Sequence, residues 1–240
     1  MGKRLGIIGG LGPLATAYYY ELITKMTQVS KDQDHIEIFI HSVPQIPDRT
    51  GFILGESKEN PLPMLLKTGR GLVKQGAECI AIPCITAHYF HQELVREIPV
   101  PIIHLVEETA EYLKCRKKKR VGIMATDGTV RSGLFQKALE NRGIEALVPE
   151  PSYQKDVMYL IYENIKMGLP PEMERFFQVA GHLQKQGAEV IVLGCTELSL
   201  IKRDQAVGAG FLDALDVLAK KAIELCGAEG RVEYQELITI

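Results

Sequence analysis

The stretch VKQGAECIAIPCITAH, residues 73–88, decides the fold because the chain contains a second version of it, LQKQGAEVIVLGCTEL, at 183–198. Each version passes from a helical pattern through KQGAE into a short apolar strand, and a cysteine follows closely. Cys84 and Cys195 hold the same place in the two versions, 111 residues apart (195 − 84). The repeat predicts two similar halves, each with one cysteine just beyond a strand.

A second pair of matching stretches begins each half. KRLGIIGGLG at 3–12 resembles KRVGIMATDG at 119–128, an offset of 116 residues (119 − 3). Helical patterns follow at 14–29 and 131–142. Strands that alternate with helices form parallel sheets with helices on both faces. We therefore expect an α/β fold of two similar parallel-sheet domains, related by pseudo-two-fold symmetry, with a cleft between them.

The expected elements and domains follow from this pattern. The first domain comprises residues 1–100, completed by the C-terminal segment 211–240, and the second comprises 101–210. Loops are expected at 43–55 and 147–152, where Pro, Gly, Asp and Ser gather, and a helix at 211–226. Strands are expected near 4–9, 36–42, 78–83, 101–104, 120–125, 145–148, 189–193 and 207–210.

Composition excludes several classes of function. The 240 residues carry a net charge of −2, which offers no field to attract nucleic acid or an anionic membrane. No apolar run is long enough to span a bilayer. Five cysteines, an odd number without an export signal, favour reduced thiols in the cytoplasm. Cys84 and His88 have no second pair at zinc-site spacing, so no metal is expected.

Two thiols in one cleft suit a reaction that inverts a carbon centre. Ligands of parallel sheets bind beyond the carboxyl ends of the strands, where both Cys84 and Cys195 are placed. One thiolate could remove a proton from one face of the carbon while the other thiol delivers a proton to the opposite face. Because the pKa of a free cysteine is about 8.5, both the thiol and the thiolate are accessible near neutral pH.

Five motifs in order resemble the aspartate/glutamate racemases: GIIGGLGPLAT (6–16), VPQIPDRT (43–50), PCITAH (83–88), ATDGTVRSG (125–133) and GCTEL (194–198). The resemblance covers most of the chain. It implies a cofactor-independent enzyme of two similar α/β domains that interconverts the L and D forms of aspartate or glutamate. It also implies a small, dicarboxylic amino-acid substrate, no nucleic-acid or membrane partner, and a homodimer.

The resemblance also implies roles for particular residues. Cys84 and Cys195 would be the two bases. Arg49 would bind one substrate carboxylate and Lys166 a second. Loops expected to hold the α-carboxylate contain Thr86, Thr126, Thr129 and Thr196, and the glycine-rich loop at Gly10 would present backbone amides to a small anion. Glu197 would either orient a substrate ammonium or satisfy a helix N-terminus. The family usually has Asn where this chain has Ile85, which puts the substrate in question.

Alternatives remain open at this point. His88 could face the cleft or pack locally. The G-x-G-x-x-A pattern at Gly10, Gly12 and Ala15 is a weak dinucleotide fingerprint, but no acidic residue follows the second strand, so no cofactor is expected. Rival functions are another enzyme of the same superfamily (a maleate isomerase, hydantoin racemase or decarboxylase) and a non-catalytic ligand-binding protein.

Overall fold

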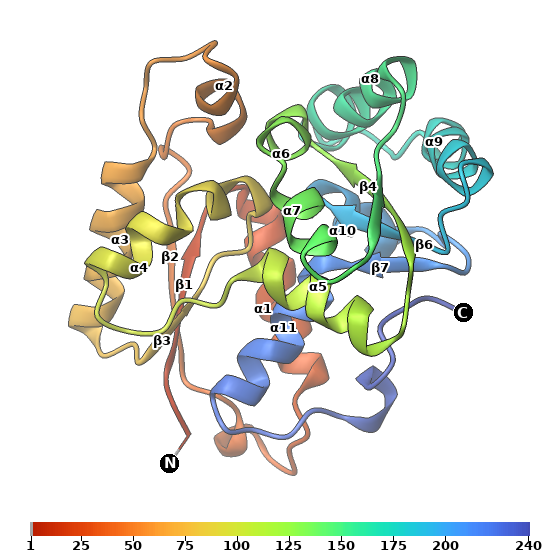
Figure 1. Ribbon diagram of the computed structural model, residues 1–240. Helices are drawn as coiled ribbons and strands as arrows, with labels where there is room; N and C mark the ends of the chain where they lie inside the picture. The colour runs from red at the N-terminus through yellow and green to blue at the C-terminus, as the bar shows by residue number, and fades with distance from the viewer. Residues whose placement is uncertain (1) are drawn as a thin grey trace.

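The computed structural model describes residues 2–240, which form two parallel β-sheets covered by helices (Figure 1). The first sheet has the strand order β2-β1-β3 and the second the order β5-β4-β6-β7. All sheet pairings are parallel. The strands are β1 (Leu5–Gly9), β2 (Ile38–Ser42), β3 (Cys79–Ala81), β4 (Arg120–Ala125), β5 (Glu145–Leu147), β6 (Val190–Gly194) and β7 (Phe211–Asp213).

The two sheets repeat one topology, as the sequence repeat predicted. In both, the first strand of the half lies in the middle, between the second and third strands. β7 then pairs with β6, and the matching place beside β3 is held by the segment expected as a strand at 101–104. That expectation was wrong, because Ile102 makes only an isolated bridge to Ile80. Pro99 and Pro101 lack the N–H that a ladder needs.

The last predicted strand and helix were also misplaced. The strand expected at 207–210 begins instead at Phe211, and the helix expected at 211–226 is α11 (Ala214–Leu225). Gly208 and Gly210 have positive φ angles of 80° and 88°, so the segment 207–210 is not extended and the strand begins only after it. Phe211 and Leu212, which fitted a helical pattern, are therefore buried strand residues.

The segment expected as a loop at 43–55 contains a helix, α2 (Arg49–Leu54). Asp48 caps it by accepting a hydrogen bond from the Gly51 N–H at 2.6 Å. The helix expected at 131–142 is two helices, α6 (Asp127–Ser132) and α7 (Leu134–Glu140), divided at Gly133 (φ 70°). The other α-helices are α1 (Pro13–Met26), α3 (Leu62–Gln75), α4 (His91–Glu97), α5 (Leu105–Cys115), α8 (Pro151–Tyr159), α9 (Met173–Lys185) and α10 (Thr196–Asp204).

The C-terminal helix α11 joins the halves. It packs against α1 of the first half and against α5, and α1 and α11 lie side by side at the centre of the molecule (Figure 1). The largest hydrophobic cluster accordingly combines Leu5, Ile123 and Leu215, from three parts of the chain. The division into domains at residues 100 and 210 stays a prediction. Among the described residues, no helix has the length and apolar character that a membrane span requires.

Candidate functional site

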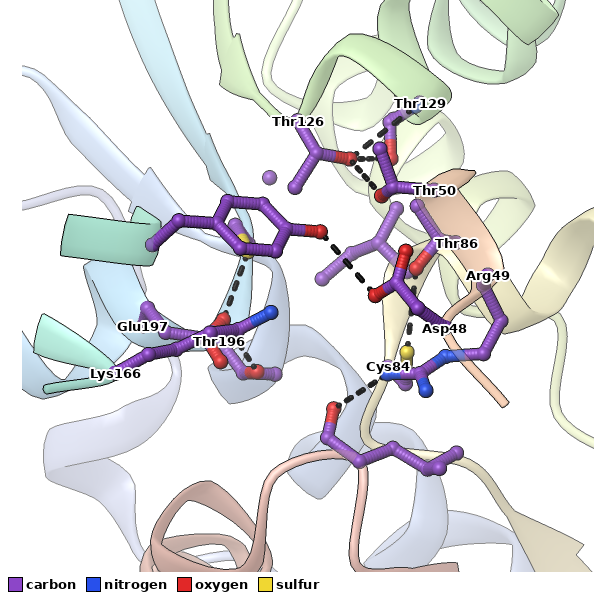
Figure 2. Close-up of a pocket in the computed structure, with 15 residues that line it drawn as sticks. Asp48, Arg49, Thr50, Cys84, Thr86, Thr126, Thr129, Lys166, Thr196 and Glu197 are labelled. Atoms are coloured by element: carbon purple, nitrogen blue, oxygen red, sulfur yellow. Dashed lines mark hydrogen bonds between the residues drawn. The ribbon is translucent and has the colours of Figure 1, made fainter. Parts of the chain in front are cut away.

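A small pocket lies between the two halves and is lined by both repeated cysteines. In Figure 2, Arg49, Cys84 and Thr86 lie on one side, with Lys166, Thr196 and Glu197 on the other. The threonines Thr50, Thr126 and Thr129 lie together at a third edge. The complete lining is Leu11, Asp48, Arg49, Thr50, Cys84, Ile85, Thr86, Thr126, Thr129, Tyr162, Lys166, Gly194, Cys195, Thr196 and Glu197.

Helix N-termini surround the pocket. Four of its lining residues are N-caps: Asp48 of α2, Cys84 of the 3₁₀ helix Ile85–Phe90, Thr126 of α6 and Cys195 of α10. A helix N-terminus presents unpaired N–H groups and the positive end of the helix dipole. The backbone of this pocket therefore favours an anion such as a carboxylate.

The Cys84 sulfur lies in a positive environment. It contacts the Thr86 hydroxyl at 3.4 Å. Arg49 lies beside it: burial lowers the pKa of the Arg49 guanidinium, but Cys84 and Asp48 next to it outweigh burial and raise that pKa above its ordinary value. A guanidinium adjacent to a thiolate is a favourable charge pair.

The Cys195 sulfur lies instead against a carboxylate. Its thiol donates a hydrogen bond to Glu197 Oε2 at 2.9 Å, and the Thr196 hydroxyl donates to the same oxygen at 3.3 Å. Burial, and after it the charge of Glu197, raises the pKa of the Cys195 thiol well above its ordinary value. Lys166 acts in the opposite direction but does not offset these effects. At neutral pH, Cys195 is therefore a protonated thiol.

Arg49 is held by backbone carbonyls and retains a free donor. Its two terminal nitrogens donate to the carbonyl oxygens of Ile46 (3.3 Å), Pro47 (3.1 Å) and Leu11 (3.5 Å). The Nε atom is buried without a hydrogen-bond partner. A buried donor without a partner costs about 1–3 kcal/mol, so a ligand acceptor at this position would gain a contact that the protein does not make.

Three threonines connect the two halves at one edge of the pocket. Thr50 of α2 donates to the Thr126 hydroxyl at 3.4 Å, and Thr126 contacts the Thr129 hydroxyl at 3.2 Å. A Cβ added at Gly128 would lie 3.0 Å from the Thr50 Cα, so α2 and α6 approach closely here. The absence of a side chain at Gly128 lets these hydroxyls meet across the two halves.

Lys166 and Tyr162 line the pocket from the second half. The Lys166 Nζ lies 3.7 Å from the centre of the Tyr162 ring, a cation–π contact. The Tyr162 hydroxyl donates to Asp48 Oδ1 at 3.4 Å and so crosses to the first half. The residues Leu160–Ile165 form a π-helical segment that continues α8 and carries Tyr162. Such segments often occur at functional sites.

Two sequence candidates do not line the pocket. The Gly10 N–H donates to the Thr16 hydroxyl at 2.9 Å. His88 is buried and bonds through Nε2 to the Ile82 carbonyl oxygen at 3.2 Å, so of the two alternatives it packs locally. Ile85 is intermediate: it contributes to the pocket wall, but it also belongs to the main hydrophobic cluster.

The sequence candidates left several lining residues out. These include Asp48 and Thr50, which flank Arg49 in the quoted motif, and Tyr162, which precedes Lys166 by four residues. Positions four residues apart share one face of a helix, and this spacing was a usable signal for Tyr162. Leu11 and Gly194 have no polar side chain and carried no chemical signal of their own.

Comparison with known proteins identifies the family. A sequence profile described as Asp/Glu/Hydantoin racemase matches residues 8–222. The chain belongs to this racemase family. The predicted resemblance and the two-sheet α/β fold are thereby confirmed.

Individual relatives agree with this assignment. The broad specificity amino-acid racemase RacX of Bacillus subtilis is 28% identical over 91% of this chain and 96% of its own. A glutamate racemase of Aquifex aeolicus is 29% identical over 68% of this chain and 61% of its own length. The solved structure of Picrophilus torridus aspartate racemase is 29% identical, covers 98% of both chains and superposes with a TM-score of 0.82.

Proposed function

We propose that this protein is a racemase that inverts the α-carbon of an amino acid by a two-base mechanism, with Cys84 and Cys195 as the bases. The observation that carries the proposal is that the two repeated cysteines line a single pocket. They extend from matching places after β3 and β6, so they approach that pocket from opposite halves. A substrate between them would present one face of its α-carbon to each sulfur.

The two sulfurs have different neighbours, and the difference assigns their roles in one direction of the reaction. Cys195, hydrogen-bonded to Glu197, is the thiol that gives a proton, so in this direction the proton-accepting role falls to Cys84, beside Arg49. The Cys84 thiolate takes the α-proton, and the C–H electron pair passes into the carboxylate as an enolate-like intermediate. The Cys195 S–H then gives its proton to the opposite face. The product leaves with Cys84 as thiol and Cys195 as thiolate, so the reverse reaction starts from this second state.

Charge development on the carboxylate governs the barrier. As the α-proton leaves, negative charge grows on the carboxylate oxygens, and donors placed there stabilise the transition state more than the substrate. The helix N-termini around the pocket and the free Nε of Arg49 supply such donors. These features support proton transfer without a cofactor.

The substrate class follows from the two cations of the pocket. Arg49 and Lys166 lie on different walls, so a substrate with two carboxylates could pair one with each. We therefore propose aspartate or glutamate as the substrate. Asp48 and Glu197 add two carboxylates to the pocket lining, and either could pair with the substrate ammonium that all amino acids share. The broad specificity of the Bacillus relative makes other amino acids the alternative to test alongside them.

A panel of L- and D-amino acids incubated in deuterated water tests the chemistry and the substrate together. Chiral chromatography measures racemisation and NMR measures exchange of the α-hydrogen. Cys84→Ser and Cys195→Ser should each lower racemisation by about 10²–10⁴-fold, the usual contribution of an acid–base group. Cys115→Ser is the matched control, because Cys115 is an exposed thiol outside the pocket. Full racemisation in either of the first two variants would overturn the two-base mechanism.

A further inference from the structure

A buried polar cluster lies behind Cys195, where α1, α10 and α11 meet. It is separate from the pocket lining and consists of Tyr18, Ser199, Lys202, Asp213 and Asp216. Asp213 and Ser199 are completely buried, and Asp216 is 6% exposed. Burying ionised groups is costly unless each is paired and hydrogen-bonded, so this cluster needs a reason to be present.

Asp213 is the centre of the cluster. Its Oδ1 accepts hydrogen bonds from the Ser199 hydroxyl at 2.7 Å and from the Leu215 N–H at 2.9 Å. Ser199 belongs to α10, and the bond from the Leu215 N–H caps α11. Asp213 also ends β7, where it pairs in register with Leu193 of β6. One carboxylate therefore ties a sheet edge to two helices.

Lys202 is placed between two carboxylates. Its Nζ bonds to Asp216 Oδ2 and lies 3.7 Å from Asp213 Oδ2. Burial and the charge of Asp213 raise the pKa of Asp216 to about 7. Asp213 Oδ2 and Asp216 Oδ1 have no hydrogen-bond partner. The other charged groups near the cluster are Glu21 and Arg203, which face Tyr18.

The cluster acts on the helix that carries Cys195. Cys195 is the N-cap of α10, and its carbonyl accepts the first backbone bonds of that helix, from Leu198 and Ser199. Ser199 thus lies one turn from Cys195 and Lys202 about one turn further. Both of them point away from the pocket, into the contact with Asp213. Whatever fixes Ser199 and Lys202 also fixes the direction in which α10 presents its N-cap thiol.

We propose that Asp213 is a positioning residue, which holds Ser199 and Lys202 of α10 and thereby sets the place of the Cys195 thiol in the pocket. The proposal rests on the proposed function only for its catalytic consequence. Cys84 has no contact with this cluster, because the 3₁₀ helix that follows it is held instead through His88, which contacts Ile82 and His104. Loosening the cluster should therefore affect the face of the substrate that Cys195 serves and leave the face of Cys84 unchanged.

Ser199→Ala is the most selective test, because it removes one tie and leaves the buried charges paired. A reacting group displaced by about 1 Å can lose ~10²-fold in rate. We expect α-hydrogen exchange by Cys195 to fall about tenfold, with exchange by Cys84 unchanged. The enantiomer that each thiol serves is assigned from the exchange that survives in Cys84→Ser and in Cys195→Ser. Thr109→Val is the control: it removes an equally buried hydroxyl, bonded to the Leu105 carbonyl oxygen at 2.8 Å, from α5.

A second measurement does not depend on enzyme activity. Iodoacetamide alkylation of Cys195 relative to Cys84, measured by mass spectrometry, should change in Ser199→Ala and stay the same in Thr109→Val. An equal fall of exchange on both faces, or an unchanged alkylation ratio, would overturn the positioning role. If the unsubstituted protein racemises no amino acid, the proposed function fails, and the alkylation ratio alone decides the role of Asp213.

Discussion

The side chain two residues after each cysteine distinguishes the two sides of the pocket. Thr86 follows Cys84 and Glu197 follows Cys195, at equivalent places of the repeat. The Cys84 sulfur contacts the Thr86 hydroxyl and lies next to Arg49. The Cys195 thiol instead donates a hydrogen bond to the Glu197 carboxylate. The backbone is repeated, but the charges are not. Single side chains therefore give a symmetric framework two sulfurs with different neighbours, a guanidinium beside Cys84 and a carboxylate beside Cys195.

Glu197→Gln should shift the pH dependence of one direction of the reaction. Burial and then the Glu197 charge raise the pKa of Cys195, so its thiolate forms only at high pH. For the enantiomer that Cys195 deprotonates, kcat/KM therefore rises with pH. An amide removes the negative charge, lowers the pKa of Cys195 and moves this rise to lower pH.

The measurement is kcat/KM against pH for both enantiomers. Glu189→Gln, an exposed substitution in the same half, is the control. Loss of activity with an unmoved pH profile in Glu197→Gln would instead make Glu197 a binder of the substrate ammonium.

Ile85→Asn should raise activity on dicarboxylic amino acids. The resemblance of the PCITAH motif implies Asn at position 85, and Ile85, which stands there instead, contributes to the pocket wall. A polar substrate group left unpaired there costs about 1–3 kcal/mol, roughly tenfold to a hundredfold in kcat/KM. The opposing factor is that Ile85 is also packed in the main hydrophobic cluster. A lower melting temperature without a gain in kcat/KM on aspartate or glutamate would show that its role is packing.

At the scale of elements, the sequence predicted the repeated segments well. It predicted poorly the short helices and the segments around glycines with positive φ angles. The first three strands of each half and both cysteine loops were found because two copies of one pattern support each other, whereas the strands expected at 101–104 and 207–210 were wrong. The helix α2 was missed because six residues are too few to show a helical period, and its cap, Asp48, lies in a proline-rich stretch. The displaced strand β7 follows two glycines with positive φ angles. Glycine adopts either sign of φ, so the sequence alone did not show where the strand begins. The Asp213 cluster joins three distant elements and leaves no local pattern.

Three histidines between the cysteine loop and α5 should make stability depend on acid. His88, His91 and His104 lie together, with ring centroids 4.1–5.9 Å apart. Burial is the main cause that lowers the pKa of all three, and for His104 the value falls to about 4. The unfolded chain binds protons below about pH 6.5, where the folded chain does not. The contribution of these histidines to the free energy of unfolding should therefore be fully present above about pH 6.5. The free energy of unfolding should fall as the pH is lowered towards 4.

His104→Asn isolates this effect. The His104 ring caps α5 by accepting from the Glu107 N–H at 3.4 Å, and asparagine is also a good N-cap. Urea unfolding from pH 7 to 5 should show a shallower loss in the variant, by up to about 1.4 kcal/mol per pH unit for one proton. His35→Asn, at a partly exposed position outside the cluster, should keep the steeper loss. Equal slopes in the two variants would contradict the assignment.

At the scale of the molecule, the pocket is a property of both halves together. Arg49 and Cys84 come from the first, Lys166 and Cys195 from the second, and Tyr162 reaches across to Asp48. Neither half contains a complete site. A ligand that contacts both walls therefore binds the assembled protein and not the unfolded chain, so binding adds directly to the free energy of unfolding.

Arg49→Lys should remove most of the stabilisation that a dicarboxylic amino acid gives. At a ligand concentration of 100 times Kd, binding contributes about 2.7 kcal/mol, which for a chain of this size raises the melting temperature by about 5–10 °C. Lysine keeps the charge but loses the planar fork and the buried Nε donor, which has no hydrogen-bond partner within the protein. The melting temperature is measured with and without aspartate or glutamate, because the difference cancels any loss of fold stability from the three carbonyl contacts of Arg49. Arg70→Lys, on the exposed face of α3, should keep the full shift. No shift in the unsubstituted protein would contradict the dicarboxylate proposal, whereas equal shifts in all three proteins would mean that Arg49 serves the fold and not the ligand.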